Sequence, residues 1–230
     1  MSALRVENVS HRFGRIPALE DVSFDVPKGS FTALLGVNGA GKTTLFSLIT
    51  RLYDSTSGRI EVAGFDIRRQ PRQALARLGV VFQSRALDLD LTLRQNLRYH
   101  AALHGLARPD ARIDQVLAMV GLSDRLHAKA RTLSGGQQRR AEIARALIHE
   151  PTLLLLDEAA AGLDAASRRD VLSIVRGLGA QGVSALWATH VFDEIAPDDP
   201  VVILHKGRVL AHRPAGTDLT TEFLEMTCAG

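Results

Sequence analysis

The chain has 230 residues, of which 46% are hydrophobic and 23% are charged, the composition of a globular protein with room for one large domain or two small ones. Lys and Arg number 28 against 25 Asp and Glu, and this net charge of +3 is not gathered into a basic stripe, which disfavours nucleic acid as the main partner. The single cysteine, Cys228, excludes an intrachain disulfide and a thiolate metal cluster and favours a reducing, cytoplasmic location.

The sequence carries no secretory or membrane-spanning signal. It opens with Met-Ser-Ala-Leu-Arg-Val-Glu, which lacks the apolar core of a signal peptide. Apolar runs such as residues 153–156 fall far short of the roughly 20 residues that cross a bilayer. We therefore expect that another chain supplies any membrane component.

The first half of the chain changes from strands to helices. Short strands are predicted by the apolar pattern at residues 4–9, 22–26 and 31–35, and a further strand pair near 58–62. Between about residues 85 and 130 the apolar residues take helical spacing, which predicts a mostly helical insert. The positions that show this spacing are Leu93, Leu97, Ala101 and Leu103, and then Ile113, Val116, Leu117 and Val120.

The second half alternates helices with unbroken apolar runs. A helix from 134 to about 149 precedes a strand at 153–156, and a helix near 166–178 precedes a strand at 184–188. This alternation indicates a parallel sheet that is buried on both faces. The strands predicted at 201–204 and 208–211 flank Lys206-Gly207 as a terminal hairpin, after which we expect no further regulatory domain.

Residues 36–43, Gly-Val-Asn-Gly-Ala-Gly-Lys-Thr, match the P-loop pattern between a predicted strand and a helical stretch at 45–52. The glycines let backbone N–H groups turn toward an anion, Lys42 neutralises β- and γ-phosphate charge, and the Thr43 hydroxyl ligates Mg²⁺. The alternative is a glycine-rich turn that happens to contain a lysine. The predicted phosphate-binding residues are Gly36, Val37, Asn38, Gly39, Ala40, Gly41, Lys42, Thr43 and Thr44.

Two acids end the apolar run at 153–156. Asp157 and Glu158 therefore lie at the carboxyl edge of the predicted sheet, where ligands bind in such folds. We predict that Asp157 holds Mg²⁺ and that Glu158 polarises the attacking water. Taken alone, either acid is better explained as the N-cap of a following helix. The P-loop upstream favours the catalytic interpretation.

The segment Leu133-Ser134-Gly135-Gly136-Gln137 opens a predicted amphipathic helix. Ser134 and Gln137 have the spacing of a capping box, which explains these two residues and not the glycine pair. Here the sequence resembles the ABC ATPase family, whose LSGGQ signature meets the γ-phosphate of a nucleotide held by a second subunit. Physically, Ser134, Gly135, Gly136 and Gln137 form a second helix N-terminus that suits an anion.

The resemblance covers nearly the whole chain and implies its fold. It implies an α/β P-loop NTPase, with a RecA-like, mainly parallel sheet core, an N-terminal antiparallel β subdomain and an inserted α-helical subdomain. We expect a single ABC ATPase domain over residues 1–230. Residues 1–84 and 146–230 form the core with its β subdomain, and residues 85–145 form the helical subdomain with the signature.

Four further sites are carried over from the family, each with a plainer structural alternative. Phe13 stands where an aromatic residue stacks on adenine, although a lone Phe is commonly a core residue. Gln83 matches the glutamine that reaches Mg²⁺ and the catalytic water, or is an ordinary loop amide. Asp164 matches the loop that crosses the dimer interface, or caps the next helix. His190 matches the histidine that touches the γ-phosphate, or is a hydrogen-bonded residue at a strand end.

Two positions depart from the common family pattern, and both replace proline. Val37 stands within the P-loop and Ala159 follows the predicted catalytic acid. Neither change removes a phosphate ligand, so we expect activity to survive. Residues 91–100 resemble bacterial ABC-2 type export ATPases, and residues 87–91 together with 187–190 are similar to a cassette associated with PQQ-dependent alcohol oxidation systems.

The resemblance implies an ATP-hydrolysing transporter subunit. Two copies would close head to tail around Mg²⁺ and ATP and act on a separately encoded integral-membrane permease, at the cytoplasmic face of the inner membrane, for export. A soluble ABC ATPase of DNA repair or translation is the main alternative, disfavoured because the chain has neither a second cassette nor a long coiled-coil insertion. A regulatory module without catalysis is a third, disfavoured by the presence of Glu158 and His190.

Overall fold

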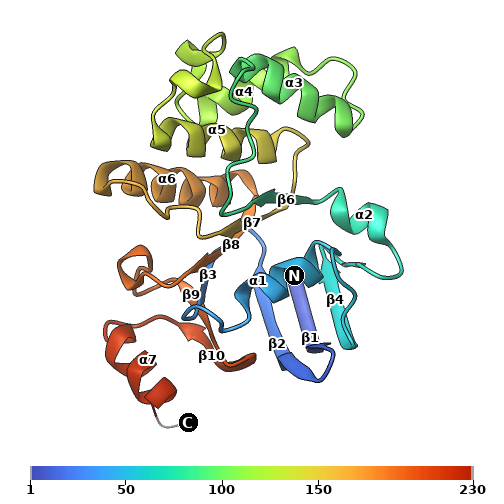
Figure 1. Cartoon of the computed structure of the whole chain (residues 1–230), viewed down its shortest axis with the longest axis vertical. Helices are drawn as coiled ribbons and strands as arrows, with labels where there is room; N and C mark the ends of the chain where they lie inside the picture. The colour runs from blue at the N-terminus through green and yellow to red at the C-terminus, as the bar shows by residue number, and fades with distance from the viewer. Residues whose placement is uncertain (1, 229–230) are drawn as a thin grey trace.

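A computed structural model describes residues 2–228 and shows two β-sheets covered by helices (Figure 1). One sheet is four-stranded and antiparallel, in the order β2-β1-β4-β5. The other is six-stranded, in the order β10-β9-β3-β8-β7-β6, and is parallel except for β10. The strands are β1 (Ser2–Phe13), β2 (Ile16–Pro27), β3 (Phe31–Leu35), β4 (Ser57–Val62), β5 (Phe65–Asp66), β6 (Leu78–Val81), β7 (Leu153–Asp157), β8 (Ser184–Thr189), β9 (Pro200–His205) and β10 (Arg208–Pro214).

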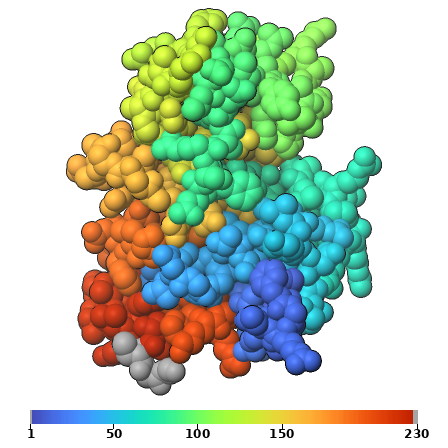
Figure 2. All heavy atoms as spheres, in the orientation of Figure 1, coloured from blue at the N-terminus to red at the C-terminus, as the bar shows by residue number. Residues whose placement is uncertain are grey.

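The helices occupy three places around the sheets. In Figure 1, α3, α4 and α5 gather at the upper end, α6 lies between them and the central sheet, and α7 lies near the C-terminus. The space-filling view shows the same order, with the green and yellow helical segments above the blue and red strand-rich part (Figure 2). The helices are α1 (Lys42–Ile49), α2 (Pro71–Leu75), α3 (Leu93–Leu103), α4 (Asp110–Met119), α5 (Gly135–Leu147), α6 (Ala165–Gly177) and α7 (Leu219–Cys228).

Strand β7 shows why the central sheet needs cover on both faces. Its four leucines, residues 153–156, are fully buried. Leu154 and Leu156 belong to the apolar cluster that contains α5 and α6, whereas Leu153 and Leu155 belong to the cluster that contains α1 and the antiparallel sheet. Because side chains alternate across a strand, an unbroken leucine run can be stable in water only between two apolar layers.

The predicted strands and helices are confirmed, with different bounds at several ends. The predicted α/β fold with an antiparallel β sheet, a mainly parallel sheet and an inserted helical segment is likewise confirmed. The strands β5 and β6 and the helices α2 and α7 had not been predicted as elements. The first three have between two and five residues, too few for a periodic apolar pattern.

Among residues 2–228, no helix has both the length and the apolar character required to traverse a bilayer.

Candidate active site

A cavity of about 760 Å³ opens at the carboxyl ends of β3 and β7. The P-loop forms one wall, and the two acids at the end of β7, Asp157 and Glu158, form another. This is the edge of a parallel sheet at which ligands bind in open α/β folds. The lining residues are Ile16, Pro17, Ala18, Val37, Asn38, Gly39, Ala40, Gly41, Lys42, Thr43, Thr44, Gln83, Asp157, Glu158, Lys206 and Gly207.

The P-loop approaches its neighbours so closely that two of its glycines have no substitute. A Cβ atom on Gly36 would lie 2.6 Å from the carbonyl oxygen of Leu204. Gly41 has φ of 110°, and a Cβ there would lie 2.8 Å from Leu19 Cδ2. Since α1 begins at Lys42, the loop ends directly in a helix N-terminus, where backbone N–H groups and the helix dipole favour an anion.

Lys42 is the buried cation of the cavity, with its side chain 6% exposed. Its Nζ donates hydrogen bonds to the carbonyl oxygens of Gly36, at 2.6 Å, and Val37, at 3.3 Å. Burial lowers the pKa of Lys42, and the negative charges of Glu158 and Asp157 oppose this shift. A phosphate group would supply stronger, charged acceptors in place of the two carbonyls, so the site suits a polyphosphate.

Glu158 lies at the centre of the predicted catalytic residues. Its Oε1 is 3.8 Å from Lys42 Nζ and 3.1 Å from His190 Nδ1, and its Oε2 accepts a hydrogen bond of 3.3 Å from Gln83 Nε2. Its backbone φ is 46°, in the left-handed region, and its N–H donates to the carbonyl of Ala188 at 3.0 Å. Such strain in a non-glycine residue costs of order 1–3 kcal/mol and clusters at functional sites.

Asp157 ends β7 and is 7% exposed. Burial raises the pKa of Asp157, the negative charge of Glu158 adds to this rise, and Lys42 opposes it. Together with the Thr43 hydroxyl and the Gln83 amide, which line the same cavity, Asp157 provides oxygen donors of the kind that Mg²⁺ prefers. The residues present therefore fit the metal that the family resemblance implies.

The signature turn lies apart from this cavity. Ser134 is the N-cap of α5: its hydroxyl accepts from Gln137 N at 3.2 Å, and the Gln137 side chain accepts from Ser134 N at 3.0 Å. Gly136 packs against α6, since a Cβ there would lie 2.5 Å from Ser167 Oγ. None of residues 134–137 is among those that line the cavity of the same chain.

Two predicted residues have local structural partners outside the cavity. Asp164 is the N-cap of α6 and accepts hydrogen bonds from Ala166 N and Ser167 N. The ring of Phe13 packs edge-on against His11 and Tyr53, with centroid distances of 4.7 and 5.6 Å. The structure thus does not place either residue on the cavity wall, and their predicted contacts with nucleotide stay predictions.

Five lining residues had not been predicted, namely Ile16, Pro17, Ala18, Lys206 and Gly207. They come from the start of β2 and from the β9–β10 turn. Gly207 N donates to the Ala40 carbonyl at 2.9 Å, and Gly207 O accepts from Glu20 N at 2.8 Å, which binds both hairpins to the P-loop. The Lys206-Gly207 turn was visible in the sequence, but nothing local to it indicates this approach.

The comparison with known protein families matches residues 19–161 to the ABC transporter family model. The chain belongs to the ABC transporter ATP-binding family. The P-loop, Gln83, the signature turn and both acids after β7 fall inside the matched region. ABC cassettes are ATPases that dimerise and serve membrane transporter components, so the chain is an ATP-binding, ATP-hydrolysing transporter subunit.

Relatives of this ABC subunit include proteins named for both resistance and import. The Linearmycin resistance ATP-binding protein LnrL of Bacillus subtilis is 36% identical over 211 residues, which are 90% of this chain and 68% of that protein. The Methionine import ATP-binding protein MetN of Desulfitobacterium hafniense is 34% identical over 225 residues, 92% of this chain and 66% of that protein.

Solved ABC cassettes share the fold over almost the full length. A structure titled as an ATP binding subunit of an ABC transporter superposes with a TM-score of 0.85 at 29% sequence identity. The superposition covers 98% of this chain and 99% of that one.

Proposed function

We propose that this subunit hydrolyses ATP as a head-to-tail homodimer and thereby drives a separately encoded membrane permease that exports its cargo. The proposal of a head-to-tail dimer rests on one observation: Ser134 to Gln137 lie outside the cavity that contains Lys42 and Glu158. A single copy thus presents two separate anion-binding helix ends, α1 and α5. A second copy, turned end for end, brings each signature turn to the other copy's P-loop.

Within each site the proposed roles follow from position. The P-loop N–H groups and Lys42 hold the phosphates, and Glu158 accepts the proton of the attacking water as general base. Gln83 and His190, each hydrogen-bonded to a different oxygen of Glu158, orient its carboxylate. Asp157, Thr43 and Gln83 would hold Mg²⁺, which would supply positive charge against the phosphate oxygens.

The permease is proposed to dock beside Gln83 and the helical segment 85–145. A cleft of about 300 Å³ there is lined by Ala86, Asp88, Leu91, Asn96, Tyr99, His100, Leu103 and Arg145. Tyr99 and Leu103 are each 66% exposed. Large apolar side chains at a polar-rimmed cleft are typical of a protein contact. The cytoplasmic membrane face is the location that this partner requires.

Export is the proposed direction of transport. It rests on the likeness of residues 91–100 to ABC-2 type exporters and on a relative named for linearmycin resistance. Import is the alternative direction, because another relative is named for methionine import. The likeness to the PQQ-associated cassette stays a prediction.

Complementation between two inactive variants tests the shared site. Lys42→Ala removes the phosphate-binding cation, and Ser134→Asp keeps an N-cap side chain while placing negative charge against the γ-phosphate. Each variant alone should lose ATPase activity. Mixed in equal amounts, they form heterodimers in which one site contains both defects and the other contains wild-type Lys42 and Ser134. We therefore expect activity to return in the mixture.

The reciprocal mixture is the control. A Lys42→Ala/Ser134→Asp double variant mixed with wild-type chain leaves one defect in each site of the heterodimer, and its heterodimers should be inactive. Wild-type homodimers in this mixture stay active, so the measure is its ATPase activity relative to the same amount of wild-type chain alone, which should fall as the double variant is added in excess. Undiminished activity here, and none in the first mixture, would mean that each site is built within one chain, and the head-to-tail dimer would be wrong. Ser134→Asn keeps a neutral N-cap side chain, so this variant should retain ATPase activity when it replaces Ser134→Asp in either mixture.

A further inference from the structure

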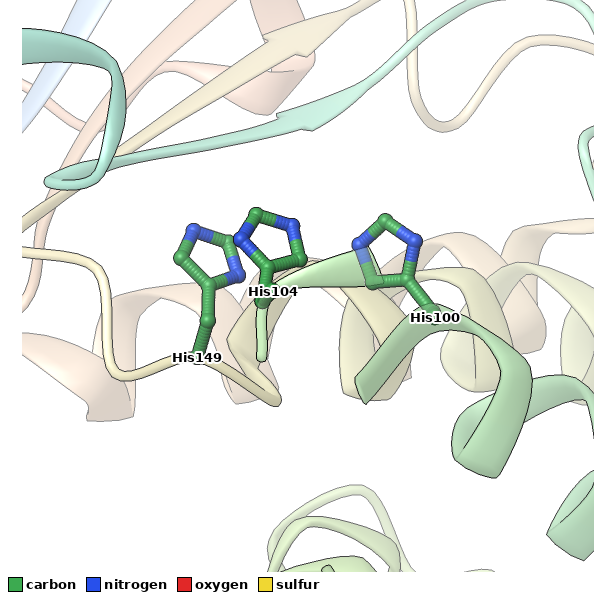
Figure 3. Close-up of side chains that lie close together, drawn as sticks. All are labelled: His100, His104 and His149. Atoms are coloured by element: carbon green, nitrogen blue, oxygen red, sulfur yellow. The ribbon is translucent and has the colours of Figure 1, made fainter. Parts of the chain in front are cut away.

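Three histidines lie together on the side of the molecule formed by α3 and the end of α5 (Figure 3). His100 is on α3 and His104 is the C-cap of the same helix, while His149 follows α5. The ring centroids of His104 and His149 are 3.8 Å apart with the planes 5° from parallel, and those of His100 and His104 are 4.8 Å apart. One ring nitrogen from each residue lies within 4.8 Å of the other two.

The Nδ1 atom of His149 has a lone pair available for a metal ion. His149 Nε2 lies 3.1 Å from the Leu78 carbonyl of β6, which can only accept, so Nε2 must carry the proton. The lone pair is therefore on Nδ1, which is buried and has no hydrogen-bond partner among the described residues. A metal-ligating histidine commonly donates its other ring N–H to a backbone carbonyl in this way.

Burial disfavours the charged form of all three imidazoles. Burial lowers the pKa of His100 and His149 to about 4, with smaller contributions from the neighbouring rings and from Arg145 and Arg112. Burial and Arg145 also lower the pKa of His104. Neutral rings can stack without charge repulsion and can donate a lone pair without first losing a proton.

We propose that His100, His104 and His149 form a binding site for one divalent transition-metal ion of the zinc class, with water completing a tetrahedral shell. His100 and His104 are four residues apart on one face of α3, the spacing that lets two imidazoles share an ion. Zn²⁺ at about 2.0–2.1 Å from each nitrogen needs nitrogens roughly 3.3 Å apart, and the three ring nitrogens lie within 4.8 Å of one another. Binding would require the exposed His104 ring to rotate out of its parallel stack on His149, so that the lone pairs of the two rings converge.

The chemistry of the cluster selects among ions. Its ligands are neutral nitrogens, and the nearby charge is the guanidinium of Arg145 rather than a carboxylate. Hard cations such as Mg²⁺ and Ca²⁺ require oxygen ligands, whereas Zn²⁺, Ni²⁺, Co²⁺ and Cu²⁺ bind imidazole. A bound ion would connect the end of α3 to the segment between α5 and β7. Since His100 also lines the cleft proposed for the permease, the ion would border that surface.

Titration of tag-free, metal-free and nucleotide-free protein with ZnCl₂ tests the site independently of ATP hydrolysis. We expect one Zn²⁺ per chain by calorimetry and a rise in Tm of about 5–10 °C at a free ion concentration 100-fold above Kd. Co²⁺ should give the intense visible absorption of tetrahedral coordination. Mg²⁺ at the same concentration should leave Tm unchanged.

His104→Phe keeps a ring stacked on His149 and removes both nitrogens, so it should weaken Zn²⁺ binding at least tenfold with little change in the metal-free Tm. His104→Ala serves if the larger ring disturbs packing. His127→Ala, an exposed histidine outside the cluster, should bind as the wild type does. Absence of Zn²⁺ binding by the wild type, or equal binding by the wild type and both His104 variants, would overturn the proposal.

Discussion

Glu158 is held from three directions by side chains of its own chain. Lys42, Gln83 and His190 all lie within 4 Å of its carboxylate, and they come from the P-loop, the segment after β6 and the end of β8. Its left-handed backbone turns the side chain at the point where β7 ends. This convergence favours a general base over a simple helix cap, because no described helix begins immediately after Glu158.

Glu158→Gln therefore tests the catalytic role. The amide can still accept from Gln83 but can no longer take a proton from water, so we expect ATP hydrolysis to slow by about 10²–10⁴. ATP affinity should stay within about threefold, since the phosphate-binding groups are unchanged. Steady-state ATPase assays and equilibrium nucleotide binding measure the two effects. An ATPase rate equal to that of the wild type would remove Glu158 from the reaction.

The first turn of α5 shows how one element serves both packing and the site. Its two glycines differ in their surroundings. A Cβ on Gly136 would meet Ser167 Oγ at 2.5 Å and Ser167 Cβ at 2.7 Å, whereas the nearest atom to a Cβ on Gly135 is Arg85 Nη2 at 3.5 Å. Gly136 is thus required for the contact between α5 and α6, and Gly135 is not.

Replacing each of these glycines by alanine tests whether the contact with α6 restricts Gly136 and leaves Gly135 unrestricted. Gly136→Ala should lower the free energy of unfolding by about 1–3 kcal/mol through overpacking, which corresponds to a Tm lower by roughly 2–10 °C. Gly135→Ala should be neutral or stabilise by up to about 1 kcal/mol, because alanine favours a helix. Thermal unfolding without nucleotide measures both. Equal losses in the two variants would contradict the packing argument.

The whole molecule presents its P-loop cavity and its signature turn as separate surfaces. Within the described residues 2–228, Ser134 to Gln137 are not among those that line the cavity. In the proposed dimer, nucleotide bound at the P-loop of one copy is the bridge to the other, with its γ-phosphate facing a second helix N-terminus.

Blocking hydrolysis should trap the bridged pair. We expect Glu158→Gln protein with Mg²⁺ and ATP to elute as a dimer in light-scattering chromatography, and as a monomer with ADP, which lacks the γ-phosphate. Adding Ser134→Asp to the same chain should restore the monomer in ATP by repulsion at the proposed contact. A Glu158→Gln protein that stays monomeric at saturating ATP would argue against a nucleotide-bridged dimer.

The sequence alone was sufficient for the elements with strong local signals. The leucine run before Asp157 predicts a strand buried on both faces, and the Gly-rich loop with Lys42 predicts a phosphate cradle before α1. The Ser134 and Gln137 spacing predicts a helix start. The buried strand and the helices that begin at Lys42 and Gly135 are confirmed, and the phosphate-binding role of the loop stays a prediction. Interactions between residues close in the sequence produce these features, so a local sequence pattern is enough to predict them.

Only the tertiary structure decided which distant residues share a site. Ile16 to Ala18 and Gly207 reach the cavity because two hairpins fold against the P-loop, and the partners of Glu158 come from three separate segments. His149 joins the His100 and His104 pair for the same reason. Such contacts are made when apolar layers close over the sheet, and no local pattern records which loops that burial brings together.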